Sequence, residues 1–314
     1  MSPRILLVAP LALALAACGA SGDGNTQTTP APAATASQAT PSAPAQAASS
    51  PASAATGEAA APAAASSASS AGNSTAPAAS TGMSAAARAA MAKAASQFVD
   101  NGKWVEGKHY FLIQPQQPKV TNTHKVEVVE VFNWGCPACN AAHKMMDKLK
   151  AELPSYATMT YLPAGFRPDE NWVLYQRTYL TAKALGLADK SYDAMFEATW
   201  KTGETASYNL GTGRLNPKSK WADLDDVAKF YHDKYGVPVK KFKAIANSFA
   251  IDTQIKRADK LVKSYGVLGT PTLVIDGKYR YGFQSAGGYA QGIALTKWLV
   301  AREAKRLADA TAAK

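Results

Sequence analysis

The chain contains 314 residues with a formal net charge of +11, and its composition divides it into two unlike parts. Residues 22 to about 82 are almost entirely Ala, Ser, Pro, Thr, Gly and Gln, too little bulky apolar surface to offset the entropy of ordering a chain. This excludes a folded domain there and leaves about 215 to 230 residues, the size of one domain. The basic residues are scattered through amphipathic segments without a nucleic-acid motif, so we expect a solvated basic face and no nucleic-acid partner.

The first 18 residues have the pattern of an export signal. A short basic start that ends at Arg4 precedes an apolar run, Ile5 to Ala17, which is too short to span a bilayer and has the size of a signal-peptide core. The residues Leu15-Ala16-Ala17-Cys18-Gly19 resemble the lipobox of a bacterial lipoprotein. That resemblance implies cleavage before Cys18 and lipidation of its sulfur and new amino group, which anchors a chain to a membrane. The alternative is an ordinary secretory peptide with a cleavage site nearby.

Composition and patterning predict the order of segments along the chain. We expect a signal peptide over residues 1–17, a disordered tether rich in Ala, Ser, Pro and Thr over 18–83, and a short helix over 84–99. A folded domain follows over 100–314, with an all-helical insertion at about 169–266. Such a tether lets an anchored domain sample the space above a membrane.

Hydrophobic periodicity predicts the elements of the domain in chain order. The expected strands are 110–113, 125–132, 156–162, 272–275 and 278–281, and the expected helices are 139–153, 171–187, 191–200, 221–235, 238–249, 252–265 and 289–308. Asp252 is expected to cap its helix, and Asp276-Gly277 is a hairpin signal. Because strands joined by a helix pair in parallel and a closing hairpin is antiparallel, the predicted fold class is α/β with a mixed sheet.

The pair Cys136 and Cys139 follows a strand and opens a helix, with Pro137 at the first helical position. A cysteine at a helix N-terminus lies where the backbone N–H groups and the helix dipole stabilise its thiolate. A metal site needs more ligands, and the domain has no third cysteine and no close pair of histidines, so we predict neither a metal nor a cofactor. A purely structural disulfide would close too small a loop to stabilise much. The spacing is instead a redox signature. We expect Cys136 to be exposed and to exchange with substrate, and Cys139 to be shielded and to resolve the mixed disulfide.

Two other positions are candidates to support this exchange. Glu130 lies in the apolar strand before the cysteines, where burial would raise the pKa of its carboxyl group and suit it to take or give the proton of the buried cysteine. The alternative is that Glu130 reaches solvent or a lysine. Thr270-Pro271 precedes an apolar strand, in which a proline cannot donate a ladder hydrogen bond. On the residues alone, Pro271 also fits an ordinary strand start.

Three stretches together resemble the DsbA family. They are residues 130–139 (Glu-Val-Phe-Asn-Trp-Gly-Cys-Pro-Ala-Cys), residues 266–279 (Gly-Val-Leu-Gly-Thr-Pro-Thr-Leu-Val-Ile-Asp-Gly-Lys-Tyr) and residues 106–110 (Glu-Gly-Lys-His-Tyr). The resemblance covers roughly residues 100 to 300. It implies a thioredoxin-like mixed sheet with an inserted helical subdomain. It also implies that Thr270 and Pro271 form the cis-proline loop, which packs beside the cysteines and pairs with the backbone of a substrate.

The same resemblance implies an activity and its setting. Family members oxidise thiols to disulfides in newly exported proteins and are re-oxidised by a DsbB-type membrane quinone reductase. For this chain we therefore expect reduced or unfolded exported polypeptides as substrates and a periplasmic location. Lipidation of Cys18 would anchor the chain to the inner or the outer membrane, and Gly19 favours the outer one by analogy with known lipoproteins.

The sequence departs from the family pattern between the cysteines. Ala138 stands where the family most often has a His that stabilises the first thiolate, and a less stabilised thiolate makes a less oxidising disulfide. Thr270 is also common in isomerase and reductase relatives, and the lysine that partners the buried acid in some relatives is Tyr161 here. Two alternatives therefore remain: a disulfide reductase or isomerase, and a peptide-binding chaperone or redox sensor without turnover.

Overall fold

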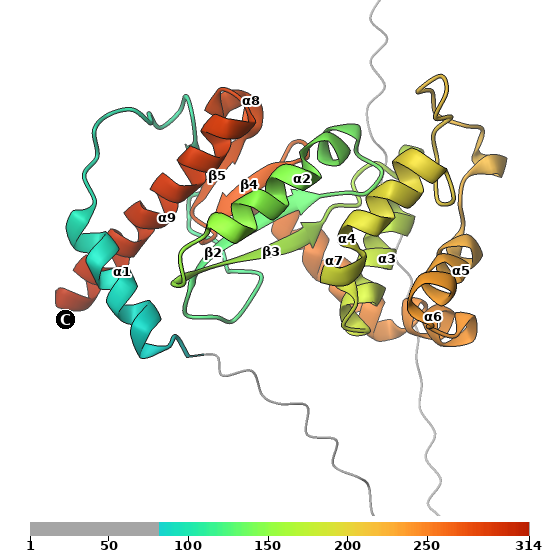
Figure 1. The fold of residues 1–314 in the computed structure, drawn as a ribbon, viewed down its shortest axis with the longest axis horizontal. Helices are drawn as coiled ribbons and strands as arrows, with labels where there is room; N and C mark the ends of the chain where they lie inside the picture. The colour runs from blue at the N-terminus through green and yellow to red at the C-terminus, as the bar shows by residue number, and fades with distance from the viewer. Residues whose placement is uncertain (1–81, 314) are drawn as a thin grey trace, which may run out of the picture. The chain divides into compact units, whose positions relative to one another are not determined.

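A five-stranded mixed sheet lies at the centre of the folded domain (Figure 1). The strand order is β1-β5-β4-β2-β3, with β1 Phe111–Leu112, β2 Val126–Phe132, β3 Ala157–Pro163, β4 Thr272–Ile275 and β5 Tyr279–Gly282. β2 pairs in parallel with β3 and antiparallel with β4, and β4 and β5 form an antiparallel hairpin. The predicted mixed sheet is therefore confirmed. Every residue of β2 is buried, as in a central strand covered on both faces.

The structure is a computed structural model that describes residues 82–313. The predicted signal peptide (1–17), Cys18 and the predicted tether up to residue 81 lie outside the described residues. The helices are α1 (Ala85–Gln97), α2 (Pro137–Glu152), α3 (Trp172–Ala184), α4 (Ala188–Glu197), α5 (Leu224–Tyr235), α6 (Val239–Ala246), α7 (Phe249–Ser264), α8 (Phe283–Ala286) and α9 (Tyr289–Ala312), with short 3-10 or π segments at Pro168–Glu170, Ala198–Thr202 and Lys218–Lys220. In this part of the chain, no helix has the length and apolar character needed to cross a membrane.

The helices between β3 and β4 pack on a different part of the sheet from the C-terminal helix. α3 and α7 pack against β3, whereas α9 packs against β2 and β4, and α1 packs across α9 (Figure 1). α2 follows β2 directly and contacts α4 as well as α9. The cysteine pair at the start of α2 therefore lies where the helical stretch between β3 and β4 meets the sheet.

The helix α7 begins earlier than the sequence predicts. Its N-cap is Ser248, whose side chain accepts a hydrogen bond from the N–H of Ile251, so the expectation that Asp252 caps this helix is wrong. Asp252 lies in the first turn instead, and its carboxylate pairs with Arg177 at 2.8 Å. A serine hydroxyl caps as well as an aspartate, and capping at Ser248 adds a further turn to the helix.

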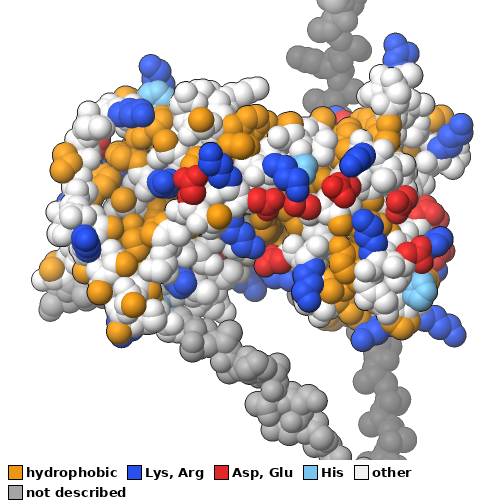
Figure 2. Space-filling model, viewed as in Figure 1, with side chains coloured by type: hydrophobic (Ala, Val, Ile, Leu, Met, Phe, Trp, Pro, Cys, Tyr) orange, Lys and Arg blue, Asp and Glu red, His pale blue; other side chains and the backbone are white. Residues whose placement is uncertain are grey.

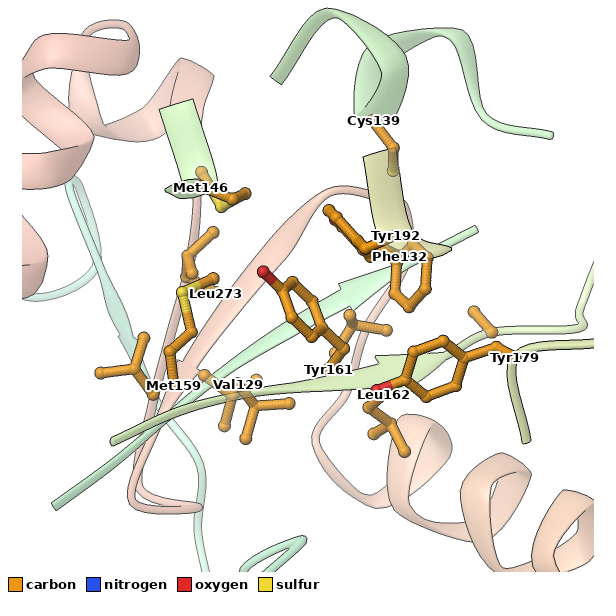
Figure 3. Packing of buried hydrophobic residues seen from close by; sticks show 14 of the residues in the cluster. Val129, Phe132, Cys139, Met146, Met159, Tyr161, Leu162, Tyr179, Tyr192 and Leu273 are labelled. Atoms are coloured by element: carbon orange, nitrogen blue, oxygen red, sulfur yellow. The ribbon is translucent and has the colours of Figure 1, made fainter. Parts of the chain in front are cut away.

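A cluster of aromatic side chains joins the sheet to the helices below the cysteine pair (Figure 3). The ring centroid of Phe132 in β2 lies 5.7 Å from that of Tyr161 in β3. It lies 5.2 Å from Tyr179 in α3 and 5.1 Å from Tyr192 in α4. Figure 3 shows Cys139 above Phe132 and Tyr192, with its sulfur directed toward them. These ring contacts stabilise the junction between β2 and the helices, and so they hold the strand that delivers the cysteines.

Basic and acidic side chains share the surface. Figure 2 shows Lys, Arg, Asp and Glu side chains interspersed across one face of the molecule. Lys150 pairs with Asp189 at 3.3 Å, and Lys297 pairs with Glu152 at 3.1 Å. Exposed pairs of this kind contribute little to stability, and they agree with the interpretation of the basic charge as a solvated face.

Candidate active site

A short turn after β2 places Cys136 at the start of α2. The side-chain oxygen of buried Asn133 accepts a hydrogen bond from the N–H of Gly135 at 2.7 Å, and its backbone oxygen accepts from the N–H of Cys136 at 3.0 Å. The side-chain nitrogen of Asn133 donates to the backbone oxygens of Ala164 and Trp172 at 2.7 and 3.1 Å. The turn is thereby tied to the segment after β3 and to the start of α3, and these contacts set the position of Cys136.

Gly135 leaves no room for a side chain in this turn. A Cβ atom added there would lie 2.8 Å from the ring of Tyr175, which is buried and whose hydroxyl donates to the backbone oxygen of Thr205 at 2.6 Å. We expect Gly135→Ala to lower the free energy of unfolding by about 1–3 kcal/mol through overpacking, as measured by urea unfolding. Gly282→Ala is the matched control, because a Cβ there meets nothing within 4 Å. Equal losses in the two variants would contradict the expectation.

Cys136 is the N-cap residue of α2, with Pro137 at the first helical position. Its sulfur accepts a hydrogen bond from the N–H of Cys139 at 3.4 Å, and in the thiol form its S–H donates to the backbone oxygen of Thr270 at 3.4 Å. Only 5% of Cys136 is exposed, so the expectation of an exposed first cysteine is wrong. The loop with Thr270 covers the sulfur, and local sequence does not indicate this because the loop lies 134 residues further along the chain.

The two cysteine sulfurs differ in acidity. The hydrogen bond from Cys139 is the main cause that lowers the pKa of Cys136 to about 6, and bonds from Thr270 and from backbone N–H groups also lower it, against the effect of burial. Cys139 is fully buried, and burial is the main cause that raises its pKa well above the ordinary value. The hydrogen bond to Cys136 and the charges of Cys136 and Glu130 raise it further. At pH 7, Cys136 is therefore mainly a thiolate and Cys139 a thiol.

Glu130 is fully buried in β2. The hydroxyl of Tyr192 donates to its Oε2 atom at 2.7 Å, whereas Oε1 is buried without a hydrogen-bond partner among the described residues. Burial raises the pKa of Glu130 to about 8, and the Tyr192 hydrogen bond opposes that rise only in part. The carboxyl group is therefore mostly protonated at pH 7. Since the charge of Glu130 also affects the pKa of Cys139, protonation of the two groups is linked.

The loop before β4 completes the site. The peptide bond between Thr270 and Pro271 is cis, and the carbonyl oxygen of Thr270 contacts the sulfur of Cys136. The Thr270 hydroxyl is buried and has no other hydrogen-bond partner in the part of the chain that the structure describes, and as a donor to the Cys136 thiolate it lowers the pKa of that sulfur. Two segments far apart in the sequence thus meet at one reactive sulfur.

We expect Thr270→Val to raise the pKa of Cys136 by about 0.5–1, because valine keeps the shape of threonine and removes one hydrogen-bond donor to the thiolate. Ultraviolet absorbance of the thiolate as a function of pH measures this value. Thr272→Val is the control, since the Thr272 hydroxyl donates to the backbone oxygen of Gly269 at 2.7 Å instead. An unchanged Cys136 pKa in Thr270→Val would show that this hydroxyl does not act on the sulfur.

Tyr192 is the contact in this site that the sequence did not indicate. It reaches Glu130 from α4, 62 residues away, and no local pattern marks a tyrosine on an amphipathic helix as the partner of a strand carboxyl. The ring of Tyr161 stacks on that of Tyr192 at 4.2 Å between centroids. Within residues 82–313, no group of three His, Cys, Asp or Glu side chains is placed to hold a metal ion.

Comparisons with known proteins agree with this geometry. The family model described as thioredoxin matches residues 122–289. The thiol:disulfide interchange protein DsbA of Pseudomonas aeruginosa is 32% identical over 214 residues, which are 68% of this chain and 92% of that protein. The DsbA of Azotobacter vinelandii is 28% identical over 63% of this chain and 83% of its own length. The crystal structure of Pseudomonas aeruginosa DsbA has a TM-score of 0.56 and 31% identity, covering 69% of this chain and 100% of that one. The DsbA structure from Xylella fastidiosa has a TM-score of 0.55 and 28% identity, covering 64% and 97%.

Proposed function

The chain belongs to the DsbA family of thiol:disulfide interchange proteins and is a protein-disulfide oxidoreductase with a thioredoxin-like fold, and we propose that its disulfide-forming chemistry runs through Cys136 and Cys139. The observation that supports this most strongly is a thiolate of lowered pKa at the tip of α2 beside a buried thiol one turn further in. A thiolate that is stable at neutral pH favours the reduced pair. A pair that favours its reduced form is an oxidant of other thiols.

Exchange begins when a substrate thiolate attacks the sulfur of Cys136 in the Cys136–Cys139 disulfide. The substrate sulfur bonds to Cys136, the disulfide breaks, and Cys139 leaves as a thiolate that takes the proton of the Glu130 carboxyl. A second substrate thiolate then attacks the substrate sulfur of this mixed disulfide, and Cys136 leaves as a thiolate. The substrate loses two electrons and gains a disulfide, and the cysteine pair is reduced. A DsbB-type membrane quinone reductase then re-oxidises the pair.

Thr270 and Pro271 hold the substrate beside the reacting sulfur, in this proposal. The contact of the Thr270 carbonyl with the Cys136 sulfur supports that role, because any chain bonded to Cys136 must pass over this loop. Pro137 starts the helix that presents the sulfur, and Ala138 lines a groove together with Thr270 and Pro271. The substrates are reduced or unfolded exported polypeptides, and the reaction takes place in the periplasm.

Oxidation of a reduced two-cysteine peptide by the oxidised chain tests the proposed direction of exchange. We expect stoichiometric oxidation of the peptide and reduction of the Cys136–Cys139 pair. A chain that leaves the peptide reduced but reduces a disulfide-bonded peptide would overturn the oxidase function. That outcome would favour the reductase alternative, which Ala138 between the cysteines suggests.

The N-terminal part of the chain supplies export and anchoring in the same proposal. Residues 1–17 are a signal peptide, Cys18 carries the lipid, residues 18–83 are the tether, and the catalytic domain begins near residue 100, with its helical part at about 169–266. Cys18→Ser tests the anchor: we expect the protein to move from the membrane fraction to the soluble periplasmic fraction and to keep its oxidase activity. Retention in the membrane fraction would contradict anchoring through Cys18.

A further inference from the structure

A groove of about 340 Å³ lies beside the cysteine pair, between the loop that carries Thr270 and the end of β5. Most of its lining is uncharged and includes Phe111, Ala138, Leu268, Phe283 and Tyr289. Leu268 is 92% exposed, so the groove offers apolar surface directly to solvent. An exposed apolar groove next to a reactive sulfur suits an extended segment of an unfolded polypeptide.

Arg280 in β5 is, among the described residues, the one charged side chain that lines this groove. It pairs in register with Phe111 of β1, and its guanidinium lies over the Phe111 ring, 5.4 Å from the centroid. It also packs against Gly266, where an added Cβ would lie 3.3 Å from its Nε atom. No carboxylate within residues 82–313 lies at ion-pair distance from it. Phe111 and Gly266 thus hold a half-buried guanidinium in place without neutralising it.

We propose that Arg280 is a specificity-determining contact: the groove binds an extended substrate segment whose acidic residue pairs with Arg280 while its cysteine reacts at Cys136. This inference rests on the proposed function. A planar guanidinium that is already held matches a carboxylate through two parallel hydrogen bonds. Its apolar, partly buried surroundings strengthen such a pair relative to one in open solvent.

The sheet register sets the spacing between the two contacts. Arg280 pairs with Val274 of β4. Val274 lies four positions along the chain from Thr270, which contacts the reacting sulfur. At about 3.3 Å per residue, this separation is on the order of 13 Å, and the long arginine side chain spans part of it. An extended peptide covers the remainder in a few residues. We therefore expect the acidic residue two to four positions from the reacting cysteine.

Matched peptides test this assignment with the full chain in its oxidised form. Reduced two-cysteine peptides carry Glu two, three or four positions from one cysteine, on either side, and each has a partner peptide with Gln at the same position. At the best position we expect kcat/KM about five- to tenfold higher for the Glu peptide. Arg280→Gln removes this preference, so that the Glu and Gln peptides of each pair are oxidised with equal kcat/KM. Lys278→Gln, on the adjoining turn of the same hairpin and outside the groove lining, changes the net charge equally and keeps the preference.

Binding of the same peptides with Ser in place of Cys gives a second readout that needs no redox chemistry. Three results would overturn the assignment. The Glu preference could persist in Arg280→Gln, Lys278→Gln could remove it equally, or no peptide position could show it. A Glu preference in binding that only Arg280→Gln removes supports the assignment even when no peptide is oxidised. In that last case the proposed oxidase function fails, whereas the groove assignment stands.

Discussion

Cys136→Ser and Cys139→Ser each abolish oxidation of a reduced two-cysteine peptide, and Cys139→Ser forms a stable mixed disulfide between Cys136 and a peptide that is supplied as a disulfide. The first variant lacks the sulfur that the substrate attacks, although serine still caps α2 and so preserves the helix start. The second variant cannot form the oxidising Cys136–Cys139 disulfide. Its Cys136 thiolate still attacks a peptide disulfide, but Cys139, which would displace the bound peptide in that direction of exchange, is gone. The two substitutions therefore block different steps, and we expect each to lower turnover to the rate without enzyme.

Free-thiol titration and mass spectrometry distinguish these two outcomes. The Cys139→Ser variant should accumulate a covalent adduct of the peptide mass when it is mixed with a disulfide-bonded peptide, and the Cys136→Ser variant should form none. Cys18→Ser is the control, because it removes a cysteine without touching the pair in the folded domain. Turnover by Cys136→Ser would contradict the assignment of the attacked sulfur, and an adduct at position 139 would reverse the two roles.

Glu130→Gln makes the protein more stable relative to wild type as the pH rises from about 5 to 8. The native Glu130 carboxyl has a pKa of about 8, against the ordinary value of 4.5 that applies to the unfolded chain. Between these values the native state holds a proton that the unfolded state has lost, so the free energy of unfolding falls with rising pH. The difference between the two pKa values corresponds to a loss of up to about 5 kcal/mol in the free energy of unfolding by pH 8. Glu130→Gln does not show this loss, because glutamine does not titrate.

Urea unfolding of the reduced proteins at pH 5 and pH 8 measures this difference. Both proteins keep the cysteine pair, so the difference between wild type and Glu130→Gln reports the carboxyl group together with its linkage to Cys139. Glu197→Gln is the matched control, since Glu197 is exposed on α4. Parallel stability curves for wild type and Glu130→Gln would contradict a buried protonated carboxyl. If Glu130 also moves the proton of Cys139, the variant should re-oxidise more slowly, and Glu197→Gln should not.

The local part of the site could be predicted from the sequence. The apolar run before the cysteines predicts β2 and the burial of Glu130, and Asp276-Gly277 predicts the β4–β5 hairpin, because both signals depend on neighbouring residues. The fold class followed from the order of these elements. The boundaries were less accurate where two signals competed, as Ser248 and Asp252 did at the start of α7.

The part of the site that the sequence did not predict depends on contacts between distant segments. The burial of Cys136 requires the Thr270 loop, and the hydrogen bond to Glu130 requires Tyr192 on α4. The position of Arg280 in the groove depends on its register with Phe111. A periodic pattern identifies which face of an element is buried, but it does not identify which side chain of another element meets that face.

The reduction potential of the Cys136–Cys139 pair tests the account most directly. A Cys136 pKa of about 6 rather than the ordinary value of 9.0 stabilises the reduced pair about tenfold at pH 7, which corresponds to about 30 mV for a two-electron couple. Equilibration with glutathione redox buffers at pH 7 gives the potential. We predict a value more oxidising than about −180 mV, well above the glutathione pool. A value near or below about −270 mV, where thioredoxin acts as a reductant, would contradict a disulfide-forming enzyme.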